Sequence, residues 1–356
     1  VEVETNGVKL ELPLHIQPGL HDEVMAMAVG YGRTHGGQVT NGIGKNVYHL
    51  AALDKKGFVG TGSAAKVTVT EKKYELAQTQ THHSMEGRQI VIEATLKEYQ
   101  NKKDHLIHKH PIWSYWSGHQ YNGHKWGMAI DLNSCTGCSA CMVACQSENN
   151  IPVVGKKYVI QGREMHWIRI DRYFTGTPEN AETVFQPVMC QHCDNAPCET
   201  VCPVLATVHS SEGLNEMVYN RCVGTRYCSN NCPYKVRRFN WFHWTKKIEK
   251  PLHMALNPDV TVRMRGVMEK CSMCVQRIQA GKLQAKIEKR PLKDGDIKMA
   301  CQQTCPTNAI IFGDGNDPNS EVSKALKSER TYYVLEEIST RPGIGYQTKV
   351  RNTVEV

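Results

Sequence analysis

The chain has 356 residues, of which 40% are hydrophobic and 22% are charged. This composition excludes a disordered or collagen-like chain and is sufficient for one large or two ordinary hydrophobic cores. The longest apolar run lies around residues 24–29 and is far shorter than the ~18 residues that cross a bilayer, so we expect no membrane-spanning segment. The formal net charge of +8 leaves nucleic acid, an anionic membrane surface and an acidic partner open at this point.

Residues 1–125 contain no cysteine, and their short alternating apolar stretches, separated by glycines, predict a β-rich domain. A short helix is expected over residues 24–29, because acidic residues precede this run and glycines follow it. Neither a charged leader nor an apolar segment follows Val1, so we expect a processed or cropped start without an export signal. The expected strands lie at residues 8–12, 67–69 and 90–92.

The chain changes character near residue 126, and residues 126–320 contain all the cysteines. We expect a metal-binding domain of short helical turns here, in a chain of the α+β class. The lysine-rich stretches at residues 246–270 and 282–298 are interpreted as solvated faces. Residues 321–356 are expected to form a C-terminal extension that begins as a helix and contributes no chemistry. Strands are expected at residues 167–173 and 332–335.

The 15 cysteines are odd in number and confined to one part of the chain, which is not typical of a chain stapled by disulfides. They form four motifs. The first has the ferredoxin spacing x2, x2, x3 without a gap, and the second and fourth have the same order with insertions. These three motifs are Cys135, Cys138, Cys141 and Cys145; Cys190, Cys193, Cys198 and Cys202, followed by Pro203; and Cys271, Cys274, Cys301 and Cys305, followed by Pro306.

Motifs of this type hold iron-sulfur cubes: three cysteines of one loop bind one cluster and the remote fourth binds another, so four motifs predict two pairs of clusters. Iron in a sulfide-bridged cube favours soft, anionic thiolates. Structural zinc is the alternative, but zinc binds four ligands in one tetrahedron and does not require this repeated spacing. A c-type haem is excluded, because no Cys-x2-Cys pair is followed by His. Clusters of roughly −2 each would nearly cancel the basic excess, so we expect no nucleic acid partner.

The third motif, Cys222 to Cys232, has Thr225 where the second cysteine is expected. A threonine hydroxyl is a poor iron ligand beside thiolates. The simplest consequence is a [3Fe-4S] cluster held by Cys222, Cys228 and the remote Cys202, which leaves twelve cysteines for three [4Fe-4S] clusters. Alternatively, water or the oxygen of Thr225 completes a four-iron cluster.

With these motifs, residues 126 to about 315 resemble the four-cluster iron-sulfur subunits of membrane-bound molybdopterin-type oxidoreductases, such as dimethyl sulfoxide, polysulfide and nitrate reductases. The resemblance implies a nested double ferredoxin-like domain in which the first motif pairs with the fourth and the second with the third. The implied [4Fe-4S] ligand sets are Cys135, Cys138, Cys141 and Cys305; Cys271, Cys274, Cys301 and Cys145; and Cys190, Cys193, Cys198 and Cys232.

Within this superfamily, the N-terminal residues make the chain most similar to one family. This is the iron-sulfur subunit of alternative complex III, a bacterial quinol-oxidising respiratory complex. Segments such as residues 30–33, 41–46 and 82–88 look like the C-terminal β-barrel domain of a molybdopterin catalytic subunit, fused here to the ferredoxin part. The resemblance implies a double-psi-barrel-like domain without molybdopterin, in a chain that corresponds to the C-terminal portion of a longer protein. His82, His83, His105, His108 and His110 have no regular ligand spacing and are interpreted as surface or hydrogen-bonded residues.

The resemblance implies an electron relay with no catalytic residue of its own. Its partners would be an integral membrane quinol-binding subunit and multihaem and monohaem c-type cytochromes, in a hetero-oligomeric complex. The chain would lie peripherally on the periplasmic side of the cytoplasmic membrane. The alternative function is the iron-sulfur subunit of a molybdopterin-dependent respiratory reductase of the polysulfide or dimethyl sulfoxide type.

Overall fold

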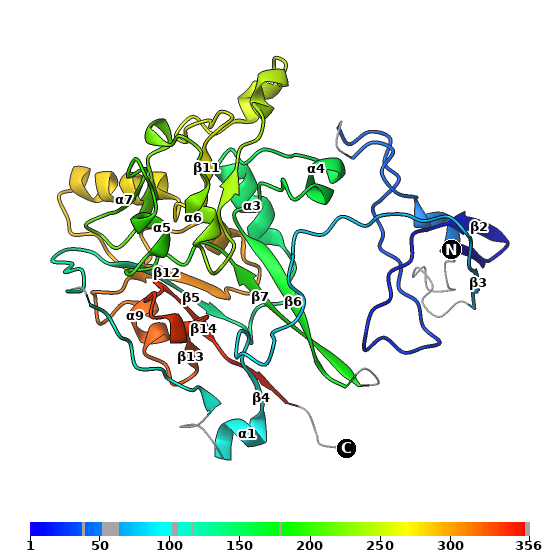
Figure 1. Cartoon of the computed structure of the whole chain (residues 1–356), viewed down its shortest axis with the longest axis horizontal. Coiled ribbons are helices and arrows are strands. Elements are labelled where there is room, and N and C mark those ends of the chain that lie inside the picture. Colours follow the sequence, from blue (N-terminus) through cyan, green and yellow to red (C-terminus); the bar gives the residue numbers. More distant parts are fainter. Residues whose placement is uncertain (38–39, 52–63, 102–105, 116, 178–179, 353–356) are drawn as a thin grey trace. The chain divides into compact units, whose positions relative to one another are not determined.

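The computed structural model describes residues 1–37, 40–51, 64–101, 106–115, 117–177 and 180–352 (Figure 1). Contacts divide the chain into two units: the first comprises residues 1–79, 153–162 and 174–183, and the second comprises the rest. The division falls at residue 80 rather than at residue 125. Residues 80–125 belong to the second unit because they bond to it: Tyr121 donates a hydrogen bond to Asp194, for example.

The first unit contains a three-stranded antiparallel sheet in the order β2-β1-β3. Its central strand buries Val3, which lies opposite Leu10 and Val67. A short 3-10 helix, η1, adds two more buried apolar residues, Val47 and Leu50. The strands are β1 (Glu2–Thr5), β2 (Val8–Glu11) and β3 (Lys66–Thr68), η1 is Val47–Leu50, and α4 (Lys156–Ile160) belongs to the same unit.

Two elements expected in the first 125 residues are not formed. Residues 24–29 are irregular rather than helical, and Val24 and Val29 are 54% and 58% exposed. A six-residue helix has little stability by itself, and the larger apolar side chains of this run remain largely exposed. Residues 90–92 do not form the expected strand. The strand β4 (Glu93–Thr95) begins directly after them, and Val91 and Ile92 are nevertheless buried. The strands expected at residues 8–12 and 67–69 are present as β2 and β3.

The second unit is built on a four-stranded sheet in the order β12-β5-β14-β13. β5 pairs antiparallel with β12 and parallel with β14, so residues after 320 supply one interior strand, β14, and one edge strand, β13, of this sheet. α9 packs on the sheet through Ala129, Val322 and Ala325, and Ser320 caps it by accepting from the backbone N–H of Ser323. The elements are β5 (Trp126–Asp131), β12 (Ile310–Asp314), β13 (Thr331–Tyr332), β14 (Ile344–Gln347) and α9 (Glu321–Leu326).

The helix expected after residue 320 is therefore present, whereas the strand expected at 332–335 is limited to the two residues of β13. The strand expected at 167–173 is present as β6 (Arg169–Gly176), which forms a hairpin with β7 (Ala181–Val188). Further two-stranded sheets are β8 (Thr207–His209) with β9 (Asn215–Met217), β10 (Arg238–Phe239) with β11 (Met268–Glu269), and β4 with β15 (Lys349–Arg351).

Short helices follow the cysteine motifs, and in Figure 1 α3, α5, α6 and α7 lie on one side of β5 and β12 in this view, with α9 on the other. They begin inside the motifs or directly after a cysteine, so the helices and the cysteine loops are continuous. Among the described residues no helix has the length and apolarity needed to span a membrane. The helices are α1 (Leu96–Asn101), α3 (Ala140–Glu148), α5 (Pro197–Thr200), α6 (Tyr227–Asn230), α7 (Val275–Ile287) and α8 (Ala300–Thr304), with 3-10 turns η2 (Tyr219–Arg221), η3 (Trp244–Lys247), η4 (Leu252–Ala255) and η5 (Glu336–Ile338).

Candidate metal centres

Three of the four cysteine motifs turn through a residue with left-handed backbone just before a helix. Ser139 before α3, Arg226 before α6 and Cys274 before α7 have φ values of 64°, 63° and 43°. Gly224 has a φ of 73°, and a side chain there would collide with the carbonyl oxygen of Gly266. Left-handed turns can direct successive backbone N–H groups into one concavity, which suits an anionic group. The first, third and fourth motifs therefore share one local geometry, although the third lacks its second cysteine.

The first set joins the start of the first motif to the end of the fourth. Cys305 lies near Cys135 and Cys141, and burial together with the thiolates of Cys135 and Cys138 raises the pKa of Cys141 to about 11. The backbone N–H of Ala309 donates to the sulfur of Cys305 over 3.3 Å. Cys138 is exposed and Cys135 and Cys305 are half-buried, so this set lies close to the surface.

The second set is enclosed by α3, α7 and α8. Burial and the thiolates of Cys271, Cys274 and Cys301 raise the pKa of Cys145 well above its ordinary value. All four cysteines are buried. The side-chain amide of Asn149 donates to the sulfurs of Cys145 and Cys274 over 3.6 and 3.8 Å.

The third set consists of Cys190, Cys193, Cys198 and Cys232, all of which are buried. Burial and the other three thiolates raise the pKa of Cys193 well above its ordinary value. The guanidinium Nη2 of Arg237 donates to the sulfur of Cys198 over 3.1 Å. This set is therefore interior, like the second, and it has a buried cation against one of its sulfurs.

The fourth set consists of Cys202, Cys222 and Cys228, with Thr225 in the same loop. Cys228 interacts with the thiolates of Cys222 and Cys202, and backbone N–H groups donate to the sulfurs of Cys202 and Cys222 over 3.1 and 3.4 Å. Thr225 is exposed, and Cys202 and Cys222 are half-buried. Like the first set, the fourth lies near the surface.

Electrostatic interactions between cysteines of different sets show which sets are neighbours. Cys301 of the second set interacts with Cys141 of the first, and Cys271 of the second set interacts with Cys190 of the third. Arg237 interacts with Cys198 of the third set and with Cys228 of the fourth. The four sets thus follow one another in a row, from the surface through the interior and back to the surface.

Two buried cations beside the sets could not be identified from the sequence. Lys270, which the sequence places in a solvated lysine-rich stretch, is 1% exposed, and its ammonium donates to the carbonyl oxygens of Asn215 and Cys271. Arg237 is 5% exposed. The expectation of a solvated face is therefore wrong at Lys270, because this side chain lies beside the second and third sets, where thiolates favour a cation. Its only signal in the sequence is that it directly precedes Cys271.

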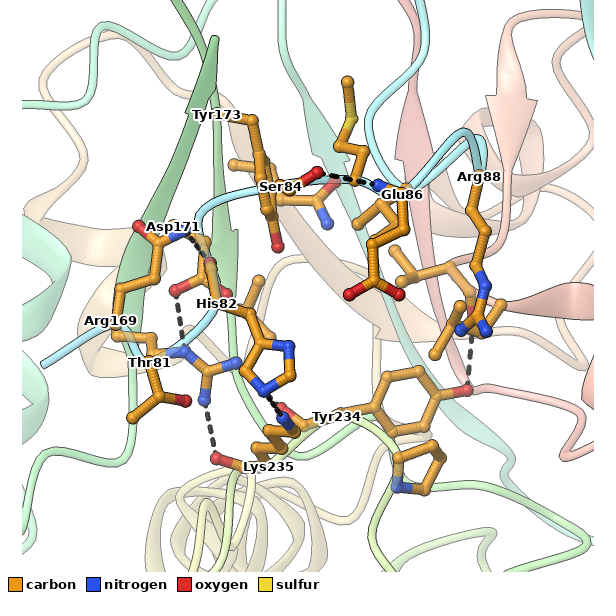
Figure 2. Close-up of a pocket in the computed structure, with 18 residues that line it drawn as sticks. Thr81, His82, Ser84, Glu86, Arg88, Arg169, Asp171, Tyr173, Tyr234 and Lys235 are labelled. Atoms are coloured by element: carbon orange, nitrogen blue, oxygen red, sulfur yellow. Dashed lines mark hydrogen bonds and ion pairs between the residues drawn. The ribbon is translucent and has the colours of Figure 1, made fainter. Parts of the chain in front are cut away.

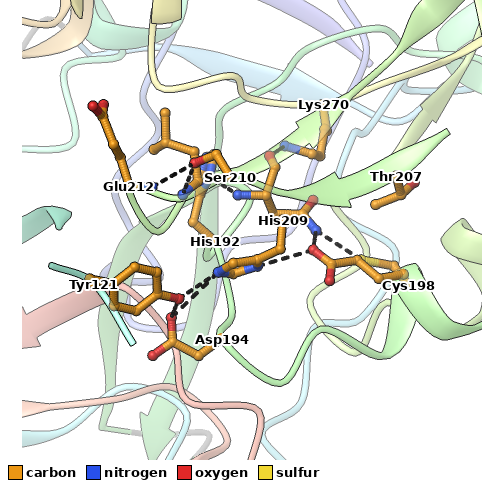
Figure 3. A network of polar contacts seen from close by, with 12 residues as sticks. Tyr121, His192, Asp194, Cys198, Thr207, His209, Ser210, Glu212 and Lys270 are labelled. Atoms are coloured by element: carbon orange, nitrogen blue, oxygen red, sulfur yellow. Dashed lines mark hydrogen bonds and ion pairs between the residues drawn. The ribbon is translucent and has the colours of Figure 1, made fainter. Parts of the chain in front are cut away.

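A chain of polar contacts leads from Tyr121 to the third set (Figure 3). The hydroxyl of Tyr121 donates to Asp194 over 2.8 Å and lies 2.6 Å from Nε2 of His209. Nδ1 of His209 lies 3.2 Å from Glu199, whose carboxylate also accepts from the amide of Asn215. The amide of Asn215 is in turn 3.8 Å from the sulfur of Cys198. The network fixes α5 and β9 beside the third set.

A cavity of about 190 Å³ lies beside Pro233 and Tyr234, which follow the last cysteine of the third set. Figure 2 shows Arg169 and Asp171 on one wall, where the two side chains are 2.7 Å apart. Lys235 donates to Nε2 of His82 at the same site. Arg169, Asp171 and Lys235 already have partners within the protein. We therefore interpret the cavity as a packing feature beside the loop that follows the third set.

The other histidines that the sequence singled out lie elsewhere. His108 and His110 contact each other edge to face, with ring centroids 4.5 Å apart. His83 is exposed, and His105 lies outside the described residues. None of them is among the residues that surround the cysteine sets above.

The four sets fit iron-sulfur clusters by the chemistry of their donors. Three or four thiols lie near one another in each set. Burial and neighbouring thiolates raise the pKa of Cys141, Cys145, Cys193 and Cys228, which opposes thiolate formation at these positions until a cation is bound. Backbone N–H groups donate to the sulfurs of Cys202, Cys222 and Cys305, as they commonly do around such clusters. The donor sets therefore suit a group that supplies positive charge to deprotonated sulfur.

Family models match this part of the chain. A model of a 4Fe-4S dicluster domain matches residues 134–206 and again residues 221–309, and a second model with the same description matches residues 181–254. All four cysteine sets lie within the matched residues. This part of the protein is therefore a tandem of 4Fe-4S dicluster domains of the ferredoxin type.

Three relatives illustrate the family. The iron-sulfur cluster-binding subunit of menaquinone reductase of Nitratidesulfovibrio vulgaris is 42% identical over 235 residues, which are 63% of this chain and 89% of that protein. A putative dimethyl sulfoxide reductase iron-sulfur subunit of Halobacterium salinarum is 36% identical over 231 residues, 62% and 78% of the two chains. An Hdr-like menaquinol oxidoreductase iron-sulfur subunit of Archaeoglobus fulgidus is 32% identical over 241 residues, 62% and 82%. The chain belongs to this family of iron-sulfur subunits of oxidoreductases.

Proposed function

We propose that this protein is an electron relay in a membrane-associated quinol oxidoreductase. One observation carries the proposal: the four cysteine sets lie in a row whose two ends reach the surface and whose middle is buried. A relay needs one exposed end for the donor and one for the acceptor. It also needs an interior that excludes water, which would otherwise solvate each charge and oppose its movement.

The proposed ligands are those implied by the resemblance. The first three sets each bind a [4Fe-4S] cluster, and the fourth binds a [3Fe-4S] cluster through Cys202, Cys222 and Cys228. The mutual proximity of the cysteines within each set supports this assignment. The exposed Thr225 supports the three-iron cluster, because its hydroxyl takes the place of a thiolate. When bound, the clusters supply one-electron carriers, while the chain supplies their ligands, hydrogen bonds and charges.

We propose that the fourth set faces the membrane subunit that oxidises quinol. Leu205, Val223 and Tyr227, within or next to the fourth-set loops, are 64%, 63% and 59% exposed. Arg226 in the same loop stacks over the ring of Trp241 at 4.9 Å. Large apolar side chains that are exposed together are typical of a surface that docks a partner. This apolar surface is next to the set without its fourth thiolate, where a higher potential suits an acceptor of quinol electrons.

The finer assignment is to alternative complex III. In that assignment electrons leave through c-type cytochrome subunits, and the complex lies on the periplasmic side of the cytoplasmic membrane. The N-terminal 125 residues are a double-psi-barrel-like relic of a molybdopterin subunit without its cofactor. The three-stranded sheet with buried Val3, Val47 and Leu50 is compatible with a β domain of this type.

The second candidate is the iron-sulfur subunit of a molybdopterin-dependent respiratory reductase. The relative from Halobacterium salinarum, described as a putative dimethyl sulfoxide reductase subunit, favours it. In both candidates the chain has the same relay; the difference lies in the partners and in the terminal acceptor.

Metal analysis and EPR of the purified, oxidised complex test both candidates. We expect about 15 non-haem irons per chain, a [3Fe-4S] signal and no molybdenum. One molybdenum per chain would favour the reductase. Zinc without iron would overturn the relay and leave a zinc-stabilised scaffold.

A further inference from the structure

Arg237 contacts two neighbouring cysteine sets at once. It follows the last cysteine of the third set by five positions and is 5% exposed. Its Nη2 donates to the sulfur of Cys198 over 3.1 Å, and the same guanidinium is close enough to Cys228 of the fourth set to interact with it electrostatically. The side chain therefore lies between a thiolate of the third set and a thiolate of the fourth.

The guanidinium of Arg237 is held in place by uncharged groups. Nη2 also donates to the amide oxygen of Asn215 over 2.9 Å, and Nη1 donates to the hydroxyl of Thr207 over 3.0 Å. These hydrogen bonds orient the planar fork without neutralising its charge. Asn215 is fixed in turn by Glu199, so a second layer of contacts supports the orientation.

The thiolates are the groups that balance this buried charge. The thiolates of Cys198 and Cys228 lie beside it and supply the opposite charge, and an arginine guanidinium has a pKa above the pH range in which proteins stay folded. The guanidinium consequently stays protonated at every pH at which the protein is folded. Its positive charge is a permanent feature of the gap between the two sets.

We propose that Arg237 is a positioning residue that raises the reduction potentials of both the third and the fourth cluster and so keeps the two matched for electron transfer. The proposal rests on the cluster content proposed above. A fixed positive charge stabilises an added electron on either side of it, and a hydrogen bond to a ligand sulfur acts in the same direction. One electron leaves one cluster as the other gains it, and Arg237 keeps its protons throughout.

The rigidity of the fork matters for the transfer step itself. A charge that is already oriented toward both sets does not have to reorganise when the electron moves, unlike water or a mobile side chain. Lysine could supply the charge but has no planar fork with which to donate to Cys198, Asn215 and Thr207 together. The geometry therefore separates a charge effect, which lysine would keep, from a bridging effect, which only arginine provides.

The test is an EPR-monitored redox titration of the whole complex with Arg237→Gln, Arg237→Lys and the control Arg238→Gln. Loss of a buried hydrogen bond from a charged donor removes the stabilisation that it gives to the added electron. For Arg237→Gln we therefore expect the redox equilibrium constants of both clusters to fall about tenfold, a drop of about 59 mV in each midpoint potential. For Arg237→Lys we expect one potential to fall and the other to stay near the wild-type value.

Arg238 is the matched control, because it is a neighbouring half-buried arginine in β10 whose charge is balanced by Glu164 over 2.7 Å. We expect Arg238→Gln to leave the potential of the fourth cluster unchanged. Unchanged potentials of both clusters in Arg237→Gln, or in Arg237→Lys if the glutamine variant does not assemble, would overturn the proposal. Absence of cluster signals from the wild-type complex would instead overturn the proposed cluster content.

Discussion

The two ends of the row of cysteine sets differ from its middle in exposure. Cys138 at one end is exposed and Cys222 at the other is half-buried, whereas the four cysteines of the second set and the four of the third are buried. The interior sets also carry the hydrogen bonds from the side chains of Asn149 and Arg237 to sulfur. Backbone N–H groups donate to sulfur in both places, to Cys202, Cys222 and Cys305 at the ends and to Cys271 in the second set.

This difference shows how one motif can serve two purposes. A cluster at the surface must exchange electrons with another protein, so its loop is open and its neighbours can be apolar and exposed. A cluster in the interior has no solvent to stabilise its charge, so fixed dipoles and cations from the chain must do so. The ligand spacing is nearly the same in both places, and the surroundings determine the role.

The largest expected effect comes from removing an interior ligand. Cys301→Ser deprives the second set of one thiolate in a site without solvent, so we expect loss of that cluster and of electron transfer from end to end. Iron analysis and single-turnover reduction of the clusters by quinol would measure this. Cys138→Ser makes the same chemical change at the exposed end, and we expect it to spare the other three clusters. Equal losses in both variants would contradict the distinction between middle and ends.

The next largest effect concerns the exposed set alone. Thr225→Cys supplies the missing thiolate, so we expect conversion of the [3Fe-4S] cluster to a [4Fe-4S] cluster with one more iron per chain and a lower midpoint potential. Thr225→Ser, which keeps a hydroxyl, serves as the control and should retain the three-iron signal. An EPR spectrum of oxidised Thr225→Cys identical to that of the wild type would argue against a vacant iron corner at this set.

The pairing of motifs into sets comes from the resemblance and stays a prediction, whereas the cysteine motifs themselves could be recognised in the sequence, because ligation by iron-sulfur clusters imposes a local spacing. The same is true of elements with strong local signals, such as the capped helix after Ser320. The helix expected at residues 24–29 was wrong, since a helix of this length depends on packing that the local pattern does not reveal.

The residues that surround the sets were missed for a different reason. Arg237, Lys270 and Asn149 are ordinary polar residues, and only the fold brings them to sulfur or beside the sets. Lys270 was assigned to a solvated face because lysine-rich stretches usually lie in solvent, but its own side chain is buried. Ligands are specified by spacing along the chain, whereas the groups that adjust their potentials are specified by tertiary contacts.

A smaller effect is expected from a neutral hydrogen-bond donor to an interior set. Asn149→Leu removes the amide that contacts the sulfurs of Cys145 and Cys274, so the midpoint potential of the second cluster should fall without loss of iron. Redox titration of the purified complex measures the shift. The adjacent Asn150 donates to the carbonyl oxygens of Asn257 and Val260 instead, so Asn150→Leu should reduce stability and leave this potential unchanged.

The smallest expected effect is on the rate at which the second set loses iron as the pH falls. Glu148 at the end of α3 pairs with Arg277 of α7 over 2.7 Å, and these two helices carry Cys145 and follow Cys274. The hydrogen bond from Arg277 lowers the pKa of Glu148 below its ordinary value of 4.5. A group with a lowered folded-state pKa contributes stability above the unfolded value and loses it as the pH falls through the folded value.

Release of iron to a chelator from Glu148→Gln should therefore be faster than from the wild type at pH 7, and the two rates should converge below about pH 4.5. The difference should be modest, because partly exposed ion pairs are worth ~1 kcal/mol or less. Glu288→Gln is the control, because it removes a carboxylate that pairs with Arg290 just beyond α7. Its rate of iron release should equal that of the wild type at both pH values. A constant ratio between Glu148→Gln and the wild type at all pH values would show that the side chain acts through packing, because only the ionised carboxylate can hold α3 against the charge on α7.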